Sequence, residues 1–276
     1  MIDRIFKGVA GNISKAFRSD YAPFHMNWLQ EKYFKHAAAR GNYSFTYRPG
    51  ITINFNDPLA FLHAAKEIFV DEIYFFKTNN PMPLILDCGG YIGMSALFFK
   101  VNHPQCRLIV FEPDRVNYQT AKRNISSWGF EQIDLLNKAV WINNDMIEFS
   151  ESNDMASSIV TINKPAHTVQ VGAERLRDYL EETVDFLKID IEGAEYEVML
   201  DIKDKLHVVQ RLFVEYHGYY HQMNKLNTVL DILTAAGFNW YIKEAHEVYK
   251  RPFYDTNTAG TYDIQLNIFA FRDDNK

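Results

Sequence analysis

Cysteine is scarce in this chain, since Cys88 and Cys106 are the only two among 276 residues. That number excludes a disulfide framework and indicates a reducing compartment. Long apolar runs are missing too, and none approaches the ~20 residues that a membrane-spanning helix requires. Charged residues interrupt residues 1–17, which therefore lack the apolar core of a secretory signal peptide. We predict a cytoplasmic protein with no transmembrane segment.

Clusters of basic residues are also absent, and the net charge is −6. Binding to a phosphate backbone requires several neighbouring cations, so we expect no nucleic-acid partner. The sequence contains no internal repeat and no low-complexity segment. Its length and its 47% hydrophobic content are sufficient for one full core with additions around it.

The N-terminal region differs in character from the rest. In residues 1–17, apolar side chains recur at helical spacing opposite basic ones. Such a helix could lie on a membrane surface, but its two glycines favour docking on its own domain or on a partner subunit, which would make a homodimer through this region. Residues 1–80 are rich in aromatics and are predicted to form a cap, with Pro81 and Pro83 marking the junction with residues 81–276.

Strand and helix patterns alternate from residue 84 onward, which is typical of a mostly parallel sheet with helices on both faces. We predict an α/β, Rossmann-like fold with seven main strands and an antiparallel pair at one edge. The expected strands are 84–88, 107–111, 133–140, 184–189, 211–216, 239–243 and 263–271. The expected helices are 92–102, 115–128, 173–182, 194–201 and 224–236, and short strands are expected near 146–149, 158–162 and 168–171.

The most informative segment follows the first of these strands, where residues 86–93 read LDCGGYIG. An apolar strand, an acidic residue, glycines and then a helix make a cradle for a nucleotide-like ligand, because glycine allows close approach and N–H groups at a helix start bind anions. The candidate cofactor-binding residues in this loop are Asp87, Gly89, Gly90, Tyr91 and Gly93.

Glu112 ends the next strand, about 20 residues after the glycines, where an acidic side chain accepts hydrogen bonds from ribose hydroxyls. The charge of the loop distinguishes between ligands. Asp87 is a poor neighbour for a pyrophosphate, which disfavours a nicotinamide dehydrogenase. The same carboxylate suits a ligand that carries an ammonium and a sulfonium, and we therefore predict S-adenosylmethionine as the cofactor.

A second constellation follows the strand 184–189, where residues 186–195 read FLKIDIEGAE. Asp190 and Glu192 emerge where the cofactor and an acceptor would meet. Either could hold the cofactor ammonium, act as a general base or bind a divalent cation, whereas acidic residues in a first helical turn also stabilise the helix itself. His217, after the strand 211–216, is a candidate base because a neutral imidazole accepts a proton near pH 7. With Glu215 these side chains could bind a hard metal, but no tight ligand motif is present and we assign no metal site.

These motifs resemble those of the FkbM-type methyltransferases, a family of S-adenosylmethionine-dependent enzymes that mostly methylate hydroxyl groups. The resemblance extends over about residues 72–216, and the segment 187–195 is its most distinctive part. It implies that Asp87 and the glycines hold the methionine portion, that Glu112 holds the ribose, and that Asp190 lies near the transferred methyl. It also implies that Asn137 and Ala139 face the adenine. The chain departs from the family at Gly90 and Tyr91, where a small residue and Asn are usual.

The predicted function is O-methylation of a hydroxyl on a sugar, a glycan or a small natural product. Asp190, His217 and Glu192 are the candidate catalytic residues, and the cap and the loop 245–262 are expected to close over the acceptor. The alternatives are an N-methyltransferase, an enzyme acting on a macromolecule, and a binding protein that retains the fold without turnover.

Overall fold

The computed structural model describes residues 19–150, 158–159, 168–255 and 262–272. Its main sheet has seven strands in the order β12-β13-β11-β10-β3-β4-β5. The first four of these strands, in chain order, are β3 (Leu84–Cys88), β4 (Arg107–Phe111), β5 (Ile133–Leu136) and β10 (Phe186–Ile189). The others are β11 (Arg211–Gly218), β12 (Asn239–Glu244) and β13 (Ile264–Phe271). Neighbouring strands from β5 to β11 are parallel, whereas β13 runs antiparallel between β11 and the outermost strand β12. The predicted fold class is confirmed.

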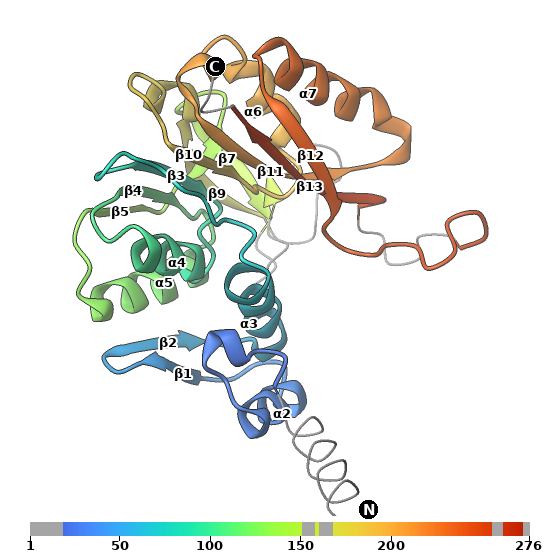
Figure 1. Cartoon of the computed structure of the whole chain (residues 1–276). Helices are drawn as coiled ribbons and strands as arrows, with labels where there is room; N and C mark the ends of the chain where they lie inside the picture. The colour runs from blue at the N-terminus through green and yellow to red at the C-terminus, as the bar shows by residue number, and fades with distance from the viewer. Residues whose placement is uncertain (1–18, 151–157, 160–167, 256–261, 273–276) are drawn as a thin grey trace, which may run out of the picture.

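Helices cover both faces of this sheet (Figure 1). On one face lie α4 (Met94–Asn102) and α5 (Arg115–Trp128), and on the other lie α6 (Glu195–Ile202) and α7 (Met223–Ala235). The helix starts are specified locally: the Asp114 carboxylate accepts from the N–H groups of Val116 and Asn117 at the start of α5, as a side-chain cap does. Alternate strand residues supply the two cores, since Ile85 belongs to one and Leu86 to the other.

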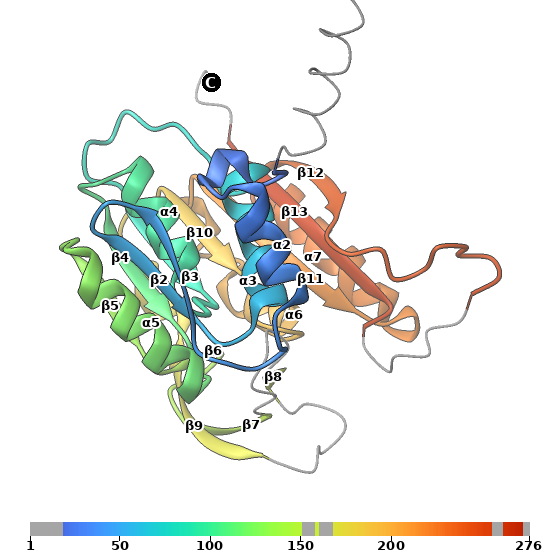
Figure 2. The same cartoon turned by 90° about the horizontal axis from the view of Figure 1, so that it is seen from below.

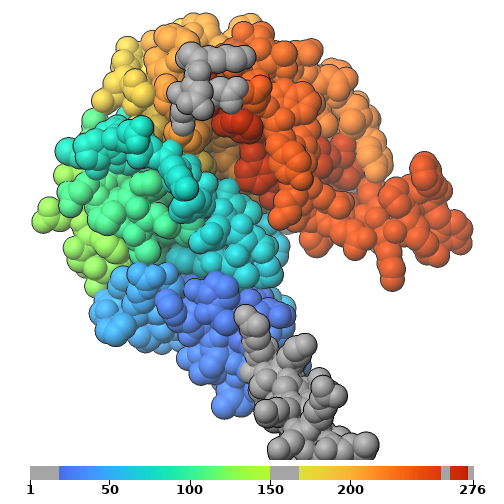
Figure 3. Space-filling model, viewed as in Figure 1, coloured from blue at the N-terminus to red at the C-terminus, as the bar shows by residue number. Residues whose placement is uncertain are grey.

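The N-terminal elements pack on the face that carries α4 and α5. They are η1 (Ala22–Phe24), α2 (Trp28–His36), β1 (Tyr43–Arg48), β2 (Ile51–Phe55), α3 (Pro58–Ala65) and a π-helical turn, η2 (Lys66–Val70). Figure 2 shows β2 beside α5, and Figure 3 shows these elements in direct contact with the sheet domain. Phe24, Phe61 and Phe69 share one core with Ile85 and Phe98. The domain division at residue 80 stays a prediction, and residues 1–17, with the proposed dimer contact, lie outside the described part.

A second, four-stranded sheet interrupts the alternation and corrects one prediction. It contains β6 (Ala139–Trp141), β7 (Met146–Ser150), β8 (Ser158–Ile159) and β9 (Val169–Arg175). The helix expected over 173–182 is therefore wrong: β9 extends to Arg175 and only a short 3₁₀ turn, η3 (Leu176–Tyr179), follows. Strand β9 pairs with β6 and β7. These strand pairings join residues that are distant in sequence, and they outweigh the local helix propensity of residues 173–182.

The single strand expected over 133–140 is in fact two, β5 and β6. The break contains Asn137, whose side-chain amide donates to the carbonyl oxygens of Glu112 and Pro113 at 2.9 and 3.0 Å. Beyond β12, the described part of the loop 245–262 projects from the body (Figure 3) with Phe253 and Tyr254 exposed. In the described ranges, no helix is both long and apolar enough to span a bilayer.

Candidate active site

One large cavity opens at the carboxyl ends of β3, β4, β10 and β11, and it encloses about 1020 Å³ when its open mouth is included. Ligands of doubly wound sheets bind at this edge. From the predicted site, seven residues line the cavity: Gly89, Gly90, Tyr91, Glu112, Ala139, Asp190 and Glu192. Four do not: Asp87 is fully buried, Gly93 is the N-cap residue of α4, Asn137 donates to the loop after β4, and the buried His217 lies next to Glu192.

The glycine loop is held tightly by the end of β4. The N–H groups of Gly89 and Gly90 both donate to the Phe111 carbonyl oxygen, at 3.0 and 2.9 Å, and the N–H of Gly93 donates to the Gly90 carbonyl. A Cβ on Gly89 would lie 1.9 Å from the Asp190 carbonyl oxygen, so only glycine fits there. Because these three N–H groups are used within the protein, they are not available to a pyrophosphate, which agrees with the prediction from charge.

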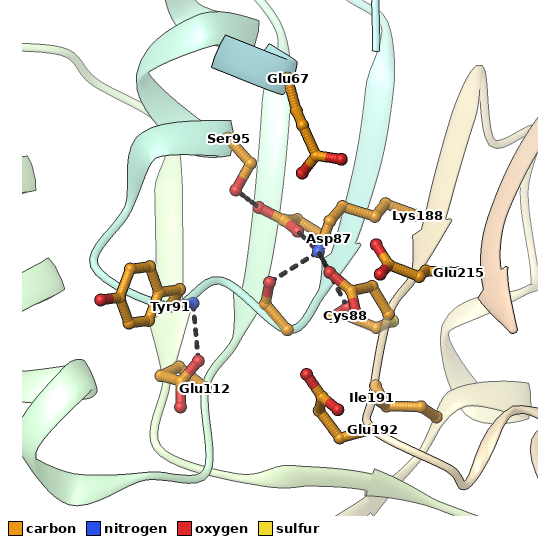
Figure 4. Close-up of polar contacts among 12 residues, drawn as sticks. Glu67, Asp87, Cys88, Tyr91, Ser95, Glu112, Lys188, Ile191, Glu192 and Glu215 are labelled. Atoms are coloured by element: carbon orange, nitrogen blue, oxygen red, sulfur yellow. Dashed lines mark hydrogen bonds and ion pairs between the residues drawn. The ribbon is translucent and has the colours of Figure 1, made fainter. Parts of the chain in front are cut away.

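Glu112 organises the other side of the loop. Its carboxylate accepts from the N–H of Tyr91 at 2.6 Å (Figure 4). It also accepts from the N–H of Asp114 at 2.9 Å. Tyr91 has φ +48°, a left-handed conformation that costs energy in a residue other than glycine. Burial raises the pKa of Glu112 to about 8, although its two backbone donors oppose the shift. A buried carboxyl that lines the cavity is suited to binding hydroxyl groups.

Below the loop, Lys188 lies between two carboxylates. Its Nζ is 3.3 Å from Oδ1 of Asp87 and 3.2 Å from Oδ2 of Asp190, and it donates to the Gly89 carbonyl oxygen at 2.7 Å. Burial would lower the pKa of Lys188, but the Asp190 and Asp87 charges outweigh it and hold the pKa well above its usual value. Asp87 is fully buried and its other oxygen accepts from the Ser95 hydroxyl. Asp87 therefore faces Lys188, and Lys188 faces the cavity.

Glu192, Glu195 and His217 form a second group at the ends of β10 and β11, in which Glu195 and His217 are buried and Glu192 is half-buried. His217 Nδ1 lies 3.1 Å from Oε1 of Glu195, and its Nε2 lies 3.6 Å from Oε2 of Glu192 and 3.5 Å from Oε1 of Glu215. The Tyr262 hydroxyl donates to the Glu192 carbonyl oxygen at 2.6 Å. This arrangement fixes the turn in which Glu192 has φ +56° and directs its side chain to the cavity.

The ionisation of this group differs from the expectation for His217. Burial would lower the pKa of His217, but the carboxylates of Glu192 and Glu195 raise it well above its usual value. An imidazolium cannot accept a proton, so the neutral base expected from the sequence is not what the geometry provides. Burial also raises the pKa of Glu192 to about 8, with the His217 charge opposing the shift.

Donor atoms of Asp190, Glu192 and His217 all lie within 4.8 Å of one another, close enough for one cation. Lys188 and His217 already supply positive charge at this point, and we assign no metal to it.

Among the cavity residues to which the sequence assigned no role are Lys188, Glu67 and His63. A lysine within the apolar run 186–189 was a usable signal, because a charged side chain in a buried strand requires a partner. Glu67 and His63 come from the N-terminal layer. No local pattern indicates that this layer contacts the sheet edge.

Comparisons with known proteins agree with this geometry. Residues 87–239 match the family model of the FkbM methyltransferase domain. Methyltransferase 1 of Beauveria bassiana is 30% identical in an alignment of 171 residues that covers 52% of this chain and 68% of that protein. The 2-O-methyltransferase NoeI of Sinorhizobium fredii is 27% identical in an alignment of 183 residues that covers 57% of this chain and 73% of NoeI.

Among solved structures, the FkbM methyltransferase of Methylobacillus flagellatus is 16% identical with a TM-score of 0.46, covering 78% of this chain and 54% of that one. That likeness is too weak to add to the assignment, which rests on the family match over more than half of the chain. The chain belongs to the FkbM methyltransferase family.

Proposed function

We propose that this protein transfers a methyl group from S-adenosylmethionine to a hydroxyl group of a sugar, a glycan or a small natural product. The observation that carries the proposal is the convergence of Asp190 and Glu192 with the glycine loop on one cavity. The name of NoeI, a 2-O-methyltransferase, supports oxygen as the acceptor atom.

Each of the proposed cofactor-binding residues is assigned to one part of S-adenosylmethionine. Glu112 lines it next to Tyr91 and would accept hydrogen bonds from the ribose hydroxyls, while Ala139 lines the wall toward the adenine. The Asp190 carboxylate lies at the methionine end, and Asp87 acts there through Lys188 rather than by direct contact. When bound, S-adenosylmethionine supplies an electrophilic methyl group on a sulfonium. The fit is favourable because the three glycine N–H groups of the loop are satisfied internally and Asp190 and Glu192 present carboxylates to the cavity.

Removal of the acceptor proton is assigned to Glu192. As the acceptor oxygen forms its bond to the methyl carbon and the carbon–sulfur bond breaks, the hydroxyl proton passes to the Glu192 carboxylate. The products are a methyl ether and S-adenosylhomocysteine. A base with a pKa of about 8 is well matched to this task near neutral pH. His217 holds Glu192 in place and stabilises its charged form.

Positioning supplies the remainder of the rate enhancement. In-line displacement requires the acceptor oxygen, the methyl carbon and the sulfur to be collinear, and holding such an arrangement is worth several powers of ten. The walls that hold it come from β10, β11 and the N-terminal layer.

The test is transfer of labelled methyl from S-adenosylmethionine to a panel of hydroxylated acceptors, followed by identification of the methylated atom by NMR. The proposal expects a methyl ether and stoichiometric S-adenosylhomocysteine. An N-methyl product would replace it with an N-methyltransferase. Cofactor binding without transfer to any hydroxyl, amine, protein or RNA acceptor would favour the non-catalytic alternative.

A further inference from the structure

Two side chains of the N-terminal layer reach the catalytic cavity. His63 lies in the last turn of α3, and Glu67 follows in the π-helical turn η2. Both line the cavity together with Asp190 and Glu215 of the main sheet. In Figure 4 the Glu67 side chain points toward Lys188 and Asp87, from an element that carries no part of the cofactor motif. Single π-turns within helices frequently occur at functional sites.

The two side chains form a pair. His63 Nδ1 lies 3.3 Å from Oε2 of Glu67, and the Glu67 side chain is 21% exposed whereas that of His63 is 51% exposed. The pair therefore has a half-buried partner, Glu67, and a more exposed partner, His63. This arrangement suits contact with a second ligand, the methyl acceptor, that enters the cavity from its mouth rather than from the glycine loop.

The pair is largely uncharged near neutral pH. Burial raises the pKa of Glu67 to about 8, and the Glu215 and Asp190 carboxylates add to the shift. Burial lowers the pKa of His63. A protonated carboxyl and a neutral imidazole each offer one hydrogen-bond donor and at least one acceptor. That combination matches hydroxyl groups, which also donate and accept.

The neighbours of the pair exclude one class of ligand. Asp190 and Glu215 lie on the same cavity and their negative charge acts on Glu67. An acceptor bearing a carboxylate or a phosphate would be repelled by these groups. An uncharged sugar ring is not repelled by these carboxylates, and its hydroxyl groups can form hydrogen bonds with Glu67 and His63.

We propose that Glu67 and His63 form the acceptor subsite of this enzyme and that it binds the hydroxyl groups of an uncharged sugar ring. This inference rests on the proposed function and deepens it by assigning acceptor recognition to the N-terminal layer. Glu67 acts as a neutral hydrogen-bonding group, and Glu192 remains the proton acceptor.

The experiment measures binding of methyl glycosides to the full chain saturated with S-adenosylhomocysteine, by saturation-transfer NMR with titration. The probes are the methyl glycosides of glucose, galactose, mannose and fucose, with methyl glucuronide as the anionic comparison. The variants are Glu67→Gln, Glu67→Ala and, as a matched control, Glu131→Ala at an exposed position away from the cavity. Isothermal titration with S-adenosylhomocysteine confirms that each variant is folded and binds the cofactor product.

At least one neutral glycoside is expected to bind while the glucuronide does not. Glu67→Gln retains a donor and an acceptor and should keep the affinity within about twofold, whereas Glu67→Ala should weaken it about tenfold, as expected for the loss of a buried hydrogen bond. Equal affinity in Glu67→Ala and in Glu131→Ala would overturn the proposal. Two further results would overturn the proposal, provided that the protein binds S-adenosylhomocysteine. One is that no glycoside binds, and the other is that the glucuronide binds more tightly than the neutral glycosides. If the cofactor product itself fails to bind, the proposed function is overturned and this subsite with it.

Discussion

The imidazole of His217 is held by Glu195, with Nδ1 of the ring 3.1 Å from Oε1 and side-chain exposures of only 2% and 1%. The same carboxylate accepts from the N–H groups of Ile191 and Gly193, at 3.2 and 3.0 Å. One buried carboxylate therefore fixes both the turn that presents Glu192 and the ring that faces it. The geometry of the proton-accepting group depends on a residue that does not touch the cavity.

Glu195→Gln is expected to lower the free energy of unfolding by about 3–5 kcal/mol, because the buried imidazolium loses the nearest of its three carboxylate neighbours. The pKa of His217 should fall in the same variant, which NMR titration of the ring would show. The matched control is Glu182→Gln, at an exposed ion pair with Arg107, where a change of less than about 1 kcal/mol is expected. A Glu195→Gln protein as stable as this control would contradict the assignment.

Lys188→Met tests the buried ion pairs below the glycine loop. Asp87 and Asp190 lose their common cation, and Asp87 is fully buried. We expect a loss of about 3–5 kcal/mol in urea denaturation. Lys205→Met, at the exposed pair with Glu181, serves as the control. An unchanged denaturation midpoint in Lys188→Met would contradict the stabilising role assigned to these ion pairs.

The sequence predicted the main sheet well because its strands are short apolar runs followed by acidic residues or glycines. The same reasoning located Glu112, Asp190 and Glu192 on one cavity, since the carboxyl ends of parallel strands meet at one edge. It failed over 173–182, where pairing with β6 and β7 decided the structure. It also failed for Glu67, because the contact between a helix of the N-terminal layer and the sheet edge is a property of packing and leaves no local pattern.

Stability should fall as the pH rises. Glu67, Glu112 and Glu192 have pKa values of about 8, against an ordinary value of 4.5. Between these values the folded protein keeps protons that the unfolded chain releases, so the free energy of unfolding decreases with pH. His217, whose pKa is also raised, contributes stability that is complete below about pH 6.5 and lost above it.

Urea denaturation at about pH 6 and about pH 9 measures this dependence. Glu112→Gln should make it shallower, because glutamine cannot ionise in the buried position, while the exposed Glu182→Gln should leave it unchanged. Stability that rises across this range would contradict the assigned protonation states.

Glu192→Gln should reduce kcat by about 10²–10⁴-fold, the usual contribution of a general base, and leave binding of S-adenosylmethionine nearly unchanged. In the wild type, the rate should increase with pH up to about 8, following the pKa of Glu192, and this limb should disappear in the variant. Glu192→Asp should restore part of the rate. A Gln variant with wild-type turnover would remove Glu192 from the mechanism.

Removal of divalent metal should have no effect. Lys188 and His217 already lie against the carboxylates of Asp190 and Glu192, and we assign no cation to this point. Dialysis against EDTA and assay with and without added Mg²⁺ or Mn²⁺ should give equal rates. Loss of activity on chelation, restored by one of these ions, would show that Asp190, Glu192 and His217 bind a metal.

The most direct test of the account is isothermal titration of the purified chain with S-adenosylmethionine, beside Glu112→Ala and the control Glu182→Ala. The account predicts one site per chain with micromolar affinity, weakened at least about tenfold in Glu112→Ala by the loss of the ribose contact, and unchanged in the control. Folded wild-type protein that binds no S-adenosylmethionine would contradict the account at its centre.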